Sequence, residues 1–156
     1  MPRLTRDQWL MRAVSKLAPI FAEAGHPLPP VKVTCDWPTD GTGMGRLGEC
    51  WSRSASDDGI NVIFIAPIVN HPLIALGILT HELVHAVDDC ASGHRGNFVR
   101  IAKRLGMGGR PTSMHPVGGL EERIRRVLAR MSPYPPAEDT RAAQRPRRFT
   151  ADHKSA

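Results

Sequence analysis

The chain has few cysteines, and no two of them have a metal-binding spacing. Its three cysteines, Cys35, Cys50 and Cys90, are odd in number and far apart in the sequence, and no C-x-x-C pair occurs. By themselves they can build neither a disulfide framework nor a zinc ribbon. We therefore expect a protein of a reducing compartment.

The sequence also lacks a long hydrophobic run. The longest apolar stretches, residues 61–69 and 73–79, are shorter than the roughly 20 residues that a membrane-spanning helix needs. Charged side chains interrupt the apolar residues near the N-terminus, so no signal-peptide core is found. These side chains are Arg3, Arg6, Asp7, Arg12 and Lys16. The two absences predict a cytoplasmic protein with no membrane partner.

Acidic side chains become scarce in the second part of the chain. The 156 residues carry 21 Lys and Arg against 15 Asp and Glu, a formal net charge of +6, and 41% of them are hydrophobic. Residues 1–94 hold 7 basic and 10 acidic side chains, whereas residues 95–131 hold 9 and 2. The apolar content suffices for the core of one domain and excludes a wholly disordered chain. The basic segment suggests nucleic acid as a partner, although a solvated basic face has the same composition.

Apolar periodicity and turn residues predict an α+β fold. The predicted helices cover residues 5–24, 72–90, 97–105 and 120–131, and a three-stranded sheet is predicted from residues 31–36, 46–52 and 60–66. The glycine-rich residues 41–45 lack the features of a phosphate loop and are interpreted as a flexible connector. We expect one domain over residues 1–131, followed by a basic, Pro- and Arg-rich tail over residues 132–156 that is disordered.

The helix predicted over residues 72–90 contains the sequence H-E-x-x-H. His81 and His85 are four residues apart, so on a helix both imidazoles lie on one face and can bind one metal ion. Both lie within an apolar helix, where an unpaired imidazole would be costly to bury. We therefore predict one zinc ion per chain, with these two histidines as ligands.

A catalytic zinc site needs three protein ligands and an open position for water. Our first choice for the third ligand is His94, because it follows a Gly/Ser turn from which the chain can fold back to the metal. A glutamate on the last predicted helix, Glu121 or Glu122, is the second choice. Asp88 and Asp89 are expected to cap or support the site, since a straight helix cannot bring three successive turns to one ion. The remaining histidines are interpreted as solvated: His26, His71, His115 and His153.

Several stretches of the sequence resemble the SprT-like zinc metallopeptidase domain, in particular the small members that bacteriophages of high-GC bacteria often encode. Residues 47–51 (LGECW) and 60–67 (INVIFIAP) resemble the two strands before the metal helix of that family, and residues 81–85 match its zinc motif. Residues 93–98 (GHRGNF) and 101–106 (IAKRLG) resemble the region of its third histidine. The resemblance covers about residues 5–131 and implies a zincin-like fold.

Two departures from the family pattern are visible. Arg95 follows His94 where the family commonly has glycine. No cysteine follows Cys90, so the C-terminal zinc ribbon of many relatives is not expected.

The resemblance implies a zinc-dependent endopeptidase that acts on a protein or peptide substrate, in the cytoplasm of a bacterial host if the chain is phage-encoded. Glu82 would take a proton from a zinc-activated water and later pass it to the leaving amine. Relatives act at DNA–protein crosslinks, so DNA-associated proteins are a candidate substrate, with DNA contacts from residues 95–131. His115, Tyr134 or an arginine could stabilise the oxyanion. The strand at residues 60–66, if it is an edge strand, could pair with an extended substrate.

Two other functions fit the same residues. One is a non-catalytic, zinc-stabilised nucleic-acid-binding module, in which Glu82 has no chemical role. The other is a regulatory metallopeptidase that cleaves one repressor and is inactive on general substrates.

Overall fold

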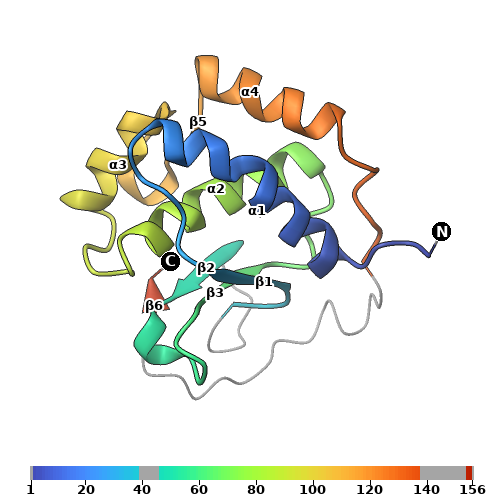
Figure 1. Ribbon diagram of the computed structural model, residues 1–156, viewed down its shortest axis with the longest axis horizontal. Helices are drawn as coiled ribbons and strands as arrows, with labels where there is room; N and C mark the ends of the chain where they lie inside the picture. The colour runs from blue at the N-terminus through green and yellow to red at the C-terminus, as the bar shows by residue number, and fades with distance from the viewer. Residues whose placement is uncertain (1, 39–45, 138–153, 156) are drawn as a thin grey trace.

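The computed structural model describes residues 2–38, 46–137 and 154–155. Its elements, in chain order, are α1 (Arg6–Glu23), β1 (Val31–Cys35), β2 (Gly48–Trp51), η1 (Arg53–Ala55), β3 (Asn61–Ile65), α2 (Pro72–Val87), α3 (Asn97–Leu105), β4 (Met107–Gly108), η2 (Pro111–Ser113), β5 (His115–Pro116), α4 (Gly118–Ala129) and β6 (Lys154–Ser155) (Figure 1). The predicted connector at residues 41–45 and most of the tail predicted to be disordered, residues 138–153 and 156, lie outside the described residues.

The main sheet has four strands in the order β1-β3-β2-β6, one more than predicted. Strand β3 pairs with β1 in parallel and with β2 antiparallel, and β6 adds two residues to the other side of β2. The condition for substrate pairing at residues 60–66, an edge strand, is therefore not met, because β3 is paired on both sides. Strand β2 lies between β3 and the two-residue strand β6.

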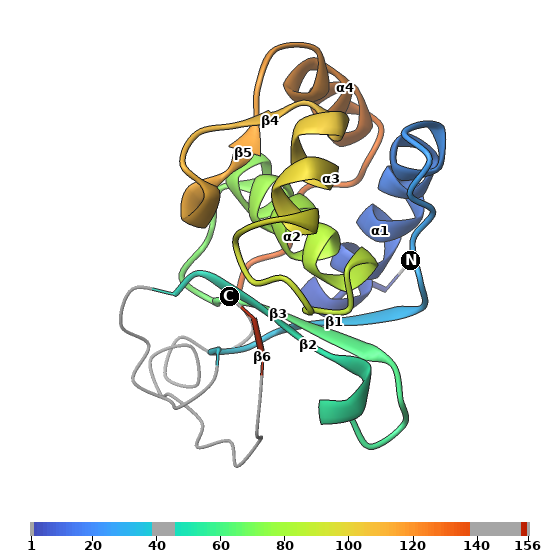
Figure 2. The same ribbon diagram turned by 90° about the vertical axis from the view of Figure 1, so that its left-hand side faces the viewer.

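Helices α1 and α2 cover one face of this sheet (Figure 2). Alternate strand residues point toward the helices, as the two-residue period of a strand requires. The inward residues of the sheet are Val31, Val33, Cys50, Ile63 and Ile65, and all are buried. No described helix is both long and apolar enough to cross a lipid bilayer.

Helix α1 begins and ends at the predicted signals. Thr5 Oγ1 accepts a hydrogen bond from the Gln8 amide at 3.1 Å, and Gln8 Oε1 accepts one from the Thr5 amide at 3.0 Å, which is a capping box. Gly25, with φ +84°, follows the last turn in a conformation that other residues rarely adopt. The buried face of α1 packs on the sheet, as the apolar periodicity predicts.

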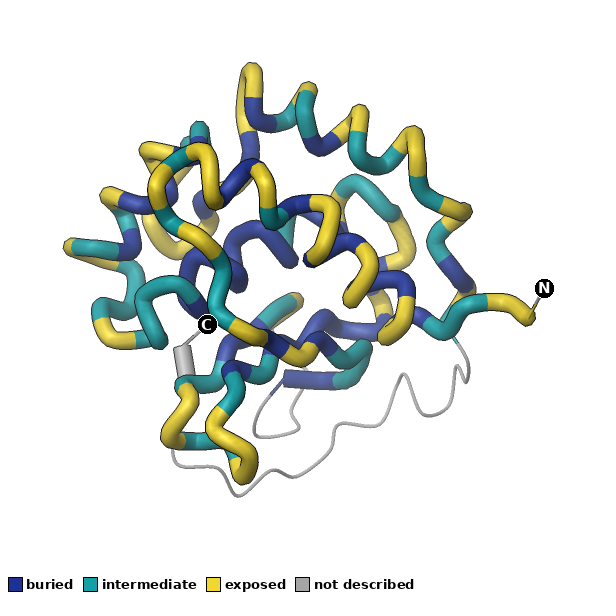
Figure 3. Tube along the Cα trace, viewed as in Figure 1, coloured by how far each residue is buried: buried dark blue, intermediate teal, exposed yellow. Residues whose placement is uncertain are grey.

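Helix α2 lies at the centre of the molecule. It contacts β2 and β3 on the sheet side and β5, α3 and α4 on the other sides. Ten of its sixteen residues are buried, so the helix is enclosed on most of its circumference (Figure 3). This explains why its sequence is apolar on all sides instead of amphipathic.

A short two-stranded sheet, β4 with β5, lies between α3 and α4, where the sequence predicts no helix or strand. Its strands have two residues each and carry no alternating pattern, so nothing in the local sequence predicts it. It brings the chain from α3 back across α2 before α4 begins (Figure 2).

Residues that the sequence analysis placed in the tail pack against α1. The buried Arg6 guanidinium donates hydrogen bonds to the carbonyl oxygens of Pro135 at 2.7 Å and Pro67 at 2.8 Å and lies 4.4 Å from the Tyr134 ring centroid. Trp9 Nε1 donates to the Ser132 carbonyl at 2.8 Å. One arginine therefore joins the first helix, the loop after β3 and the chain beyond α4.

We expect Arg6→Met to lower the free energy of unfolding by about 2–3 kcal/mol, because several buried carbonyl groups lose a charged donor. Arg12→Met is the matched control, since Arg12 is an exposed arginine of the same helix and should change the stability by less than about 0.5 kcal/mol. Urea denaturation of both variants measures the difference. Equal effects of the two substitutions would contradict this role of Arg6.

Candidate metal centre

Helix α2 places two histidines on one buried face. His81 is 7% exposed and His85 is fully buried, and the ring centroids lie 5.1 Å apart. His81 Nδ1 lies 2.8 Å from the carbonyl oxygen of Met114. A hydrogen bond to this carbonyl needs the proton on Nδ1, which leaves the lone pair of His81 on Nε2, where a metal ligand would need it.

The third histidine comes from the turn after α2. Nε2 of His94 lies 3.3 Å from Nε2 of His81 and 3.2 Å from Nε2 of His85. Three nitrogens that each bind zinc tetrahedrally at 2.0–2.1 Å are about 3.3 Å from one another. The two separations from His94 match this value, and one ligand nitrogen from each of the three histidines lies within 4.8 Å of the other two, so the three form a cluster that could hold a metal ion.

Asp88 holds the turn that connects the end of α2 to His94. Its carboxylate accepts hydrogen bonds from the Ser92 amide at 2.7 Å, from Ser92 Oγ at 3.1 Å and from Asn97 Nδ2 at 2.8 Å. These contacts join the end of α2 to the start of α3, on either side of His94. Asp88 therefore holds the turn that carries His94, and its support of a metal site stays a prediction.

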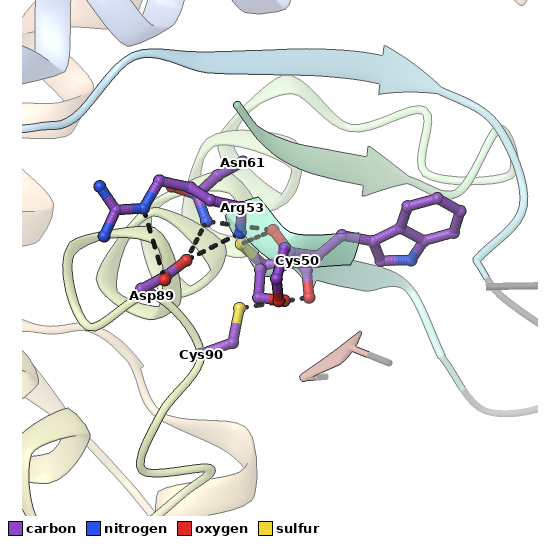
Figure 4. Close-up of polar contacts among 8 residues, drawn as sticks. Cys50, Arg53, Asn61, Asp89 and Cys90 are labelled. Atoms are coloured by element: carbon purple, nitrogen blue, oxygen red, sulfur yellow. Dashed lines mark hydrogen bonds and ion pairs between the residues drawn. The ribbon is translucent and has the colours of Figure 1, made fainter. Parts of the chain in front are cut away.

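Asp89 fastens the end of α2 to the sheet (Figure 4). Its Oδ1 accepts hydrogen bonds from the Arg53 amide at 2.9 Å and from Asn61 Nδ2 at 3.0 Å, and Asn61 also donates to the Trp51 carbonyl. Cys90 Sγ donates to the Cys50 carbonyl at 3.4 Å beside them. Asp89 and Cys90 both have positive φ, 49° and 58°, which ends the helix sharply and turns the chain toward His94.

Burial keeps the imidazoles in the form that binds metals. It lowers the pKa of His81, and the neighbouring His94 adds to this while the Met114 carbonyl opposes it. Burial also lowers the pKa of His94, with a further contribution from the Arg46 charge. Neutral imidazoles are the ligand form, so the surroundings favour metal binding at neutral pH.

Phe98, on α3, forms an apolar wall of the cluster. Its ring stacks on His85 at 4.2 Å with an interplanar angle of 20°, and it lies 5.0 Å from His81 and 5.2 Å from His94. Because the Phe98 ring contacts each of the three imidazoles, it restricts their orientations. The sequence offers one signal for this residue, its position four residues after His94 at the start of a helix.

Glu82 lies beside the histidines with its carboxylate buried. It is 3% exposed, and Oε2 has no hydrogen-bond partner among the described residues. Burial raises the pKa of Glu82 well above the ordinary glutamate value, Cys90 and Glu49 add to the increase, and Arg46 opposes it. A buried carboxylate oxygen without a partner is unfavourable unless another group meets it.

Strand β2 reaches Glu82 through a glycine. A Cβ atom at Gly48 would lie 2.5 Å from Cγ2 of Ile78 and 3.0 Å from Oε1 of Glu82. Any larger residue would push the strand away from α2. Sequence reasoning did not identify Gly48, because its role depends on the approach of two distant elements.

A cleft of about 660 Å³ opens next to the cluster, and its lining includes His81, Glu82 and His94. His115, which the sequence interpretation left as a solvated residue or an oxyanion donor, lines this cleft together with Arg46. Tyr134 does not line it, since its ring packs 4.7 Å from Trp9 and on Arg6. The Tyr134 position therefore does not support it as an oxyanion donor.

The alternative ligands lie outside the cluster. Glu121 lines the cleft but pairs with Arg125 at 3.0 Å, and Glu122 is exposed on α4. His71 is the N-cap residue of α2 and makes no side-chain cap bond. Within the described part of the chain, no other histidine, cysteine or carboxylate joins the three histidines, and His153 falls outside that part.

Comparisons of the chain with protein-family models, with curated proteins and with solved structures found no match. The fold and the site by themselves define an α+β protein with a three-histidine cluster that could hold one metal ion.

We expect the purified protein to bind about one Zn²⁺ per chain and His94→Ala to weaken this binding by about 100-fold or more, because two ligands cannot replace three. His71→Ala, at the exposed N-cap position before α2 and outside the cluster, should leave zinc affinity unchanged. Competition with a chromogenic chelator measures the affinities. If His94→Ala kept full zinc while Glu121→Ala lost it, the third ligand would be Glu121.

The Asp89 anchor predicts a pH-dependent contribution to stability. Burial raises its pKa, but the hydrogen bonds from Arg53 and Asn61 and the Arg53 charge outweigh burial, so the pKa of Asp89 lies below the ordinary value. A lowered folded-state pKa stabilises the fold above the unfolded pKa of about 3.9, and this contribution is lost as the pH falls through the folded-state value.

We therefore expect Asp89→Asn to lower the free energy of unfolding by about 1 kcal/mol at pH 7, a figure that allows for a side chain that is 36% exposed. Asparagine tolerates the positive φ, so the substitution tests the charge. The deficit should shrink below about pH 4. Urea denaturation from pH 7 to pH 3 checks this, with the exposed Asp57→Asn as control. A deficit that stays constant over this range would contradict the prediction.

Proposed function

We propose that the protein is a zinc-dependent endopeptidase with a zincin-like, SprT-like fold. The observation that supports this most directly is the position of Glu82, which lines an open cleft together with His81 and His94 of the histidine cluster. One of its carboxylate oxygens, Oε2, is buried and has no hydrogen-bond partner among the described residues. A merely structural metal site closes its coordination with four protein ligands and has no need of such a carboxylate. Three ligands with an adjacent base are the arrangement of hydrolytic zinc sites.

His81, His85 and His94 would hold the ion through Nε2. Zinc bound there would supply a water molecule of lowered pKa and an electrophile for the substrate carbonyl oxygen. The positive charge of the ion would also favour the ionised form of Glu82, against the effect of burial.

The proton transfers fall to Glu82. The Glu82 carboxylate would take a proton from the water as the water oxygen attacks the carbonyl carbon of the peptide bond, and it would return the proton to the amide nitrogen as the carbon–nitrogen bond breaks. Glu82 lines the cleft together with His81 and His94, and its Oε2 has no hydrogen-bond partner among the described residues. His115 and Arg46 line the same cleft and are the candidates for stabilising the oxyanion.

The nucleic-acid partner stays a prediction. Arg123, Arg126 and Arg130 lie with Lys16 along a separate depression between α1 and α4, and Arg123 is paired with Glu23 at 2.7 Å. Arg95 lies next to His94, at a shallow depression that borders the metal cluster. Arg95 therefore adjoins the histidine cluster, whereas Arg123, Arg126 and Arg130 line a different depression.

We expect Glu82→Gln to retain one zinc per chain and to reduce the cleavage rate of casein by at least about 100-fold, because the amide cannot accept the proton. Glu122→Gln, an exposed glutamate of α4 that does not line the cleft, is the control and should cleave at the wild-type rate. The same assay with a DNA-bound protein tests the narrower substrate class. Unchanged cleavage by zinc-loaded Glu82→Gln would refute the mechanism, and a zinc-loaded wild type that cleaves neither substrate would favour the non-catalytic module.

A further inference from the structure

Most of the surface of the cleft beside Glu82 is contributed by apolar side chains. They come from the segment before β2, from α2, from the β4–β5 region and from α4, and they include Leu47, Leu73, Ile74, Ile78, Met114 and Ile124. Leu47 and Ile74 remain 42% and 53% exposed, so apolar surface is left open to solvent. Apolar surface that is open in a concave site beside reactive groups is typical of a ligand pocket.

Two glycines line this cleft for different reasons. Gly48 is required by packing, since a Cβ atom there would collide with Ile78. Gly77 is not, because the nearest atom to a Cβ at that position would be Cδ of Pro116 at 3.7 Å, an ordinary contact. Its φ is not positive, so the backbone does not need glycine either.

Gly77 is therefore unfavourable for the stability of α2. A glycine inside a helix is less stable than alanine by roughly 1 kcal/mol, and here neither packing nor backbone geometry explains its presence. Its effect is on the cleft: Gly77 is one helical turn before His81 and leaves space in the wall next to the proposed metal site.

We infer that Gly77 determines specificity and keeps open a subsite for a large aliphatic or aromatic side chain next to the scissile bond of an extended polypeptide. This inference rests on the proposed endopeptidase function. A side chain that enters past Gly77 would meet Ile74, Ile78 and Ile124 while the neighbouring peptide bond faces Glu82 and the histidines.

The shape of the cleft favours a polypeptide as the occupant. A volume of about 660 Å³ exceeds that of one side chain and accommodates the flanking backbone as well. Gly48, at the start of β2, also lines the cleft, and it lies before the two residues of β2 that pair with β6, Cys50 and Trp51. A strand end at the wall of a cleft is a surface on which an extended chain can lie.

The test uses full-length protein with Glu82→Gln, loaded with zinc, so that binding is measured without cleavage. The probes are two fluorescein-labelled peptides of alanine and serine that differ only in a central leucine or alanine, and fluorescence anisotropy gives their affinities. We expect the leucine peptide to bind about 10-fold tighter, because a leucine side chain loses its contact with water in the cleft.

In the Glu82→Gln background, a second substitution Gly77→Leu should remove this preference. Gly77→Ala in the same background should reduce the preference and, because alanine favours the helix, raise the melting temperature by about 2–4 °C. The Gly77→Ala variant keeps the test informative if the leucine variant does not fold. Gly119→Ala is the matched control, because it adds a methyl group to a helical glycine of α4 with open space around it and away from the cleft. It should leave the preference unchanged.

Equal binding of the two peptides, no binding of either, or a preference that survives in folded Gly77→Leu would overturn the subsite. Cleavage of the leucine peptide by protein that retains Glu82 separates this result from a failure of the proposed function. A leucine preference without cleavage would support the apolar subsite and refute the peptidase function. Cleavage without a leucine preference would support the peptidase function and refute the subsite.

Discussion

The structure depends on the burial of helix α2, an apolar helix that nevertheless carries two imidazoles and a carboxylate into the interior. Burying such groups is unfavourable unless each meets a partner, and the neighbouring segments supply partners to the two histidines. The β4–β5 segment presents the Met114 carbonyl to His81, and the turn after α2 returns His94 to both histidines. Glu82, which lines the cleft, keeps one buried oxygen without a hydrogen-bond partner among the described residues.

The two ends of α2 are fixed by different means. Two consecutive aspartates hold its C-terminal end. Asp89 accepts hydrogen bonds from Asn61 and Arg53 on the sheet side. Asp88 accepts hydrogen bonds from Ser92 and Asn97 on the α3 side. The N-terminal end follows a loop whose carbonyl groups are held by Arg6. The helix is therefore positioned between the sheet and α3 by polar contacts at both ends, which determines where His81 and His85 lie relative to β2.

Local sequence patterns predicted the parts of the molecule that obey local rules. The capped and amphipathic α1, the helix α3 and the pair His81 and His85 follow from spacing alone, and His94 follows from the turn that precedes it. The β4–β5 pair, β6, Gly48 and the Met114 carbonyl could not be predicted, because each depends on contact between elements far apart in the chain. The C-terminal end of α2 was predicted three residues too late, since the positive φ of Asp89 and Cys90 reflects tertiary anchoring and not their intrinsic preference.

Two positions on α2 run against what stability alone would favour, and both face the same cleft. Glu82 is a buried carboxylate with an unpartnered oxygen, and Gly77 is a helix-interior glycine with room for a side chain. Positions that violate local rules without a structural reason tend to mark functional sites, because selection for chemistry or binding can retain what folding would remove. The two residues are five positions apart on one helix, and they flank His81 in the cleft wall. The cluster alone would be compatible with a structural metal site. The proposed peptidase function, by contrast, would account together for the buried Glu82 oxygen that has no partner among the described residues and for the open apolar cleft beside it.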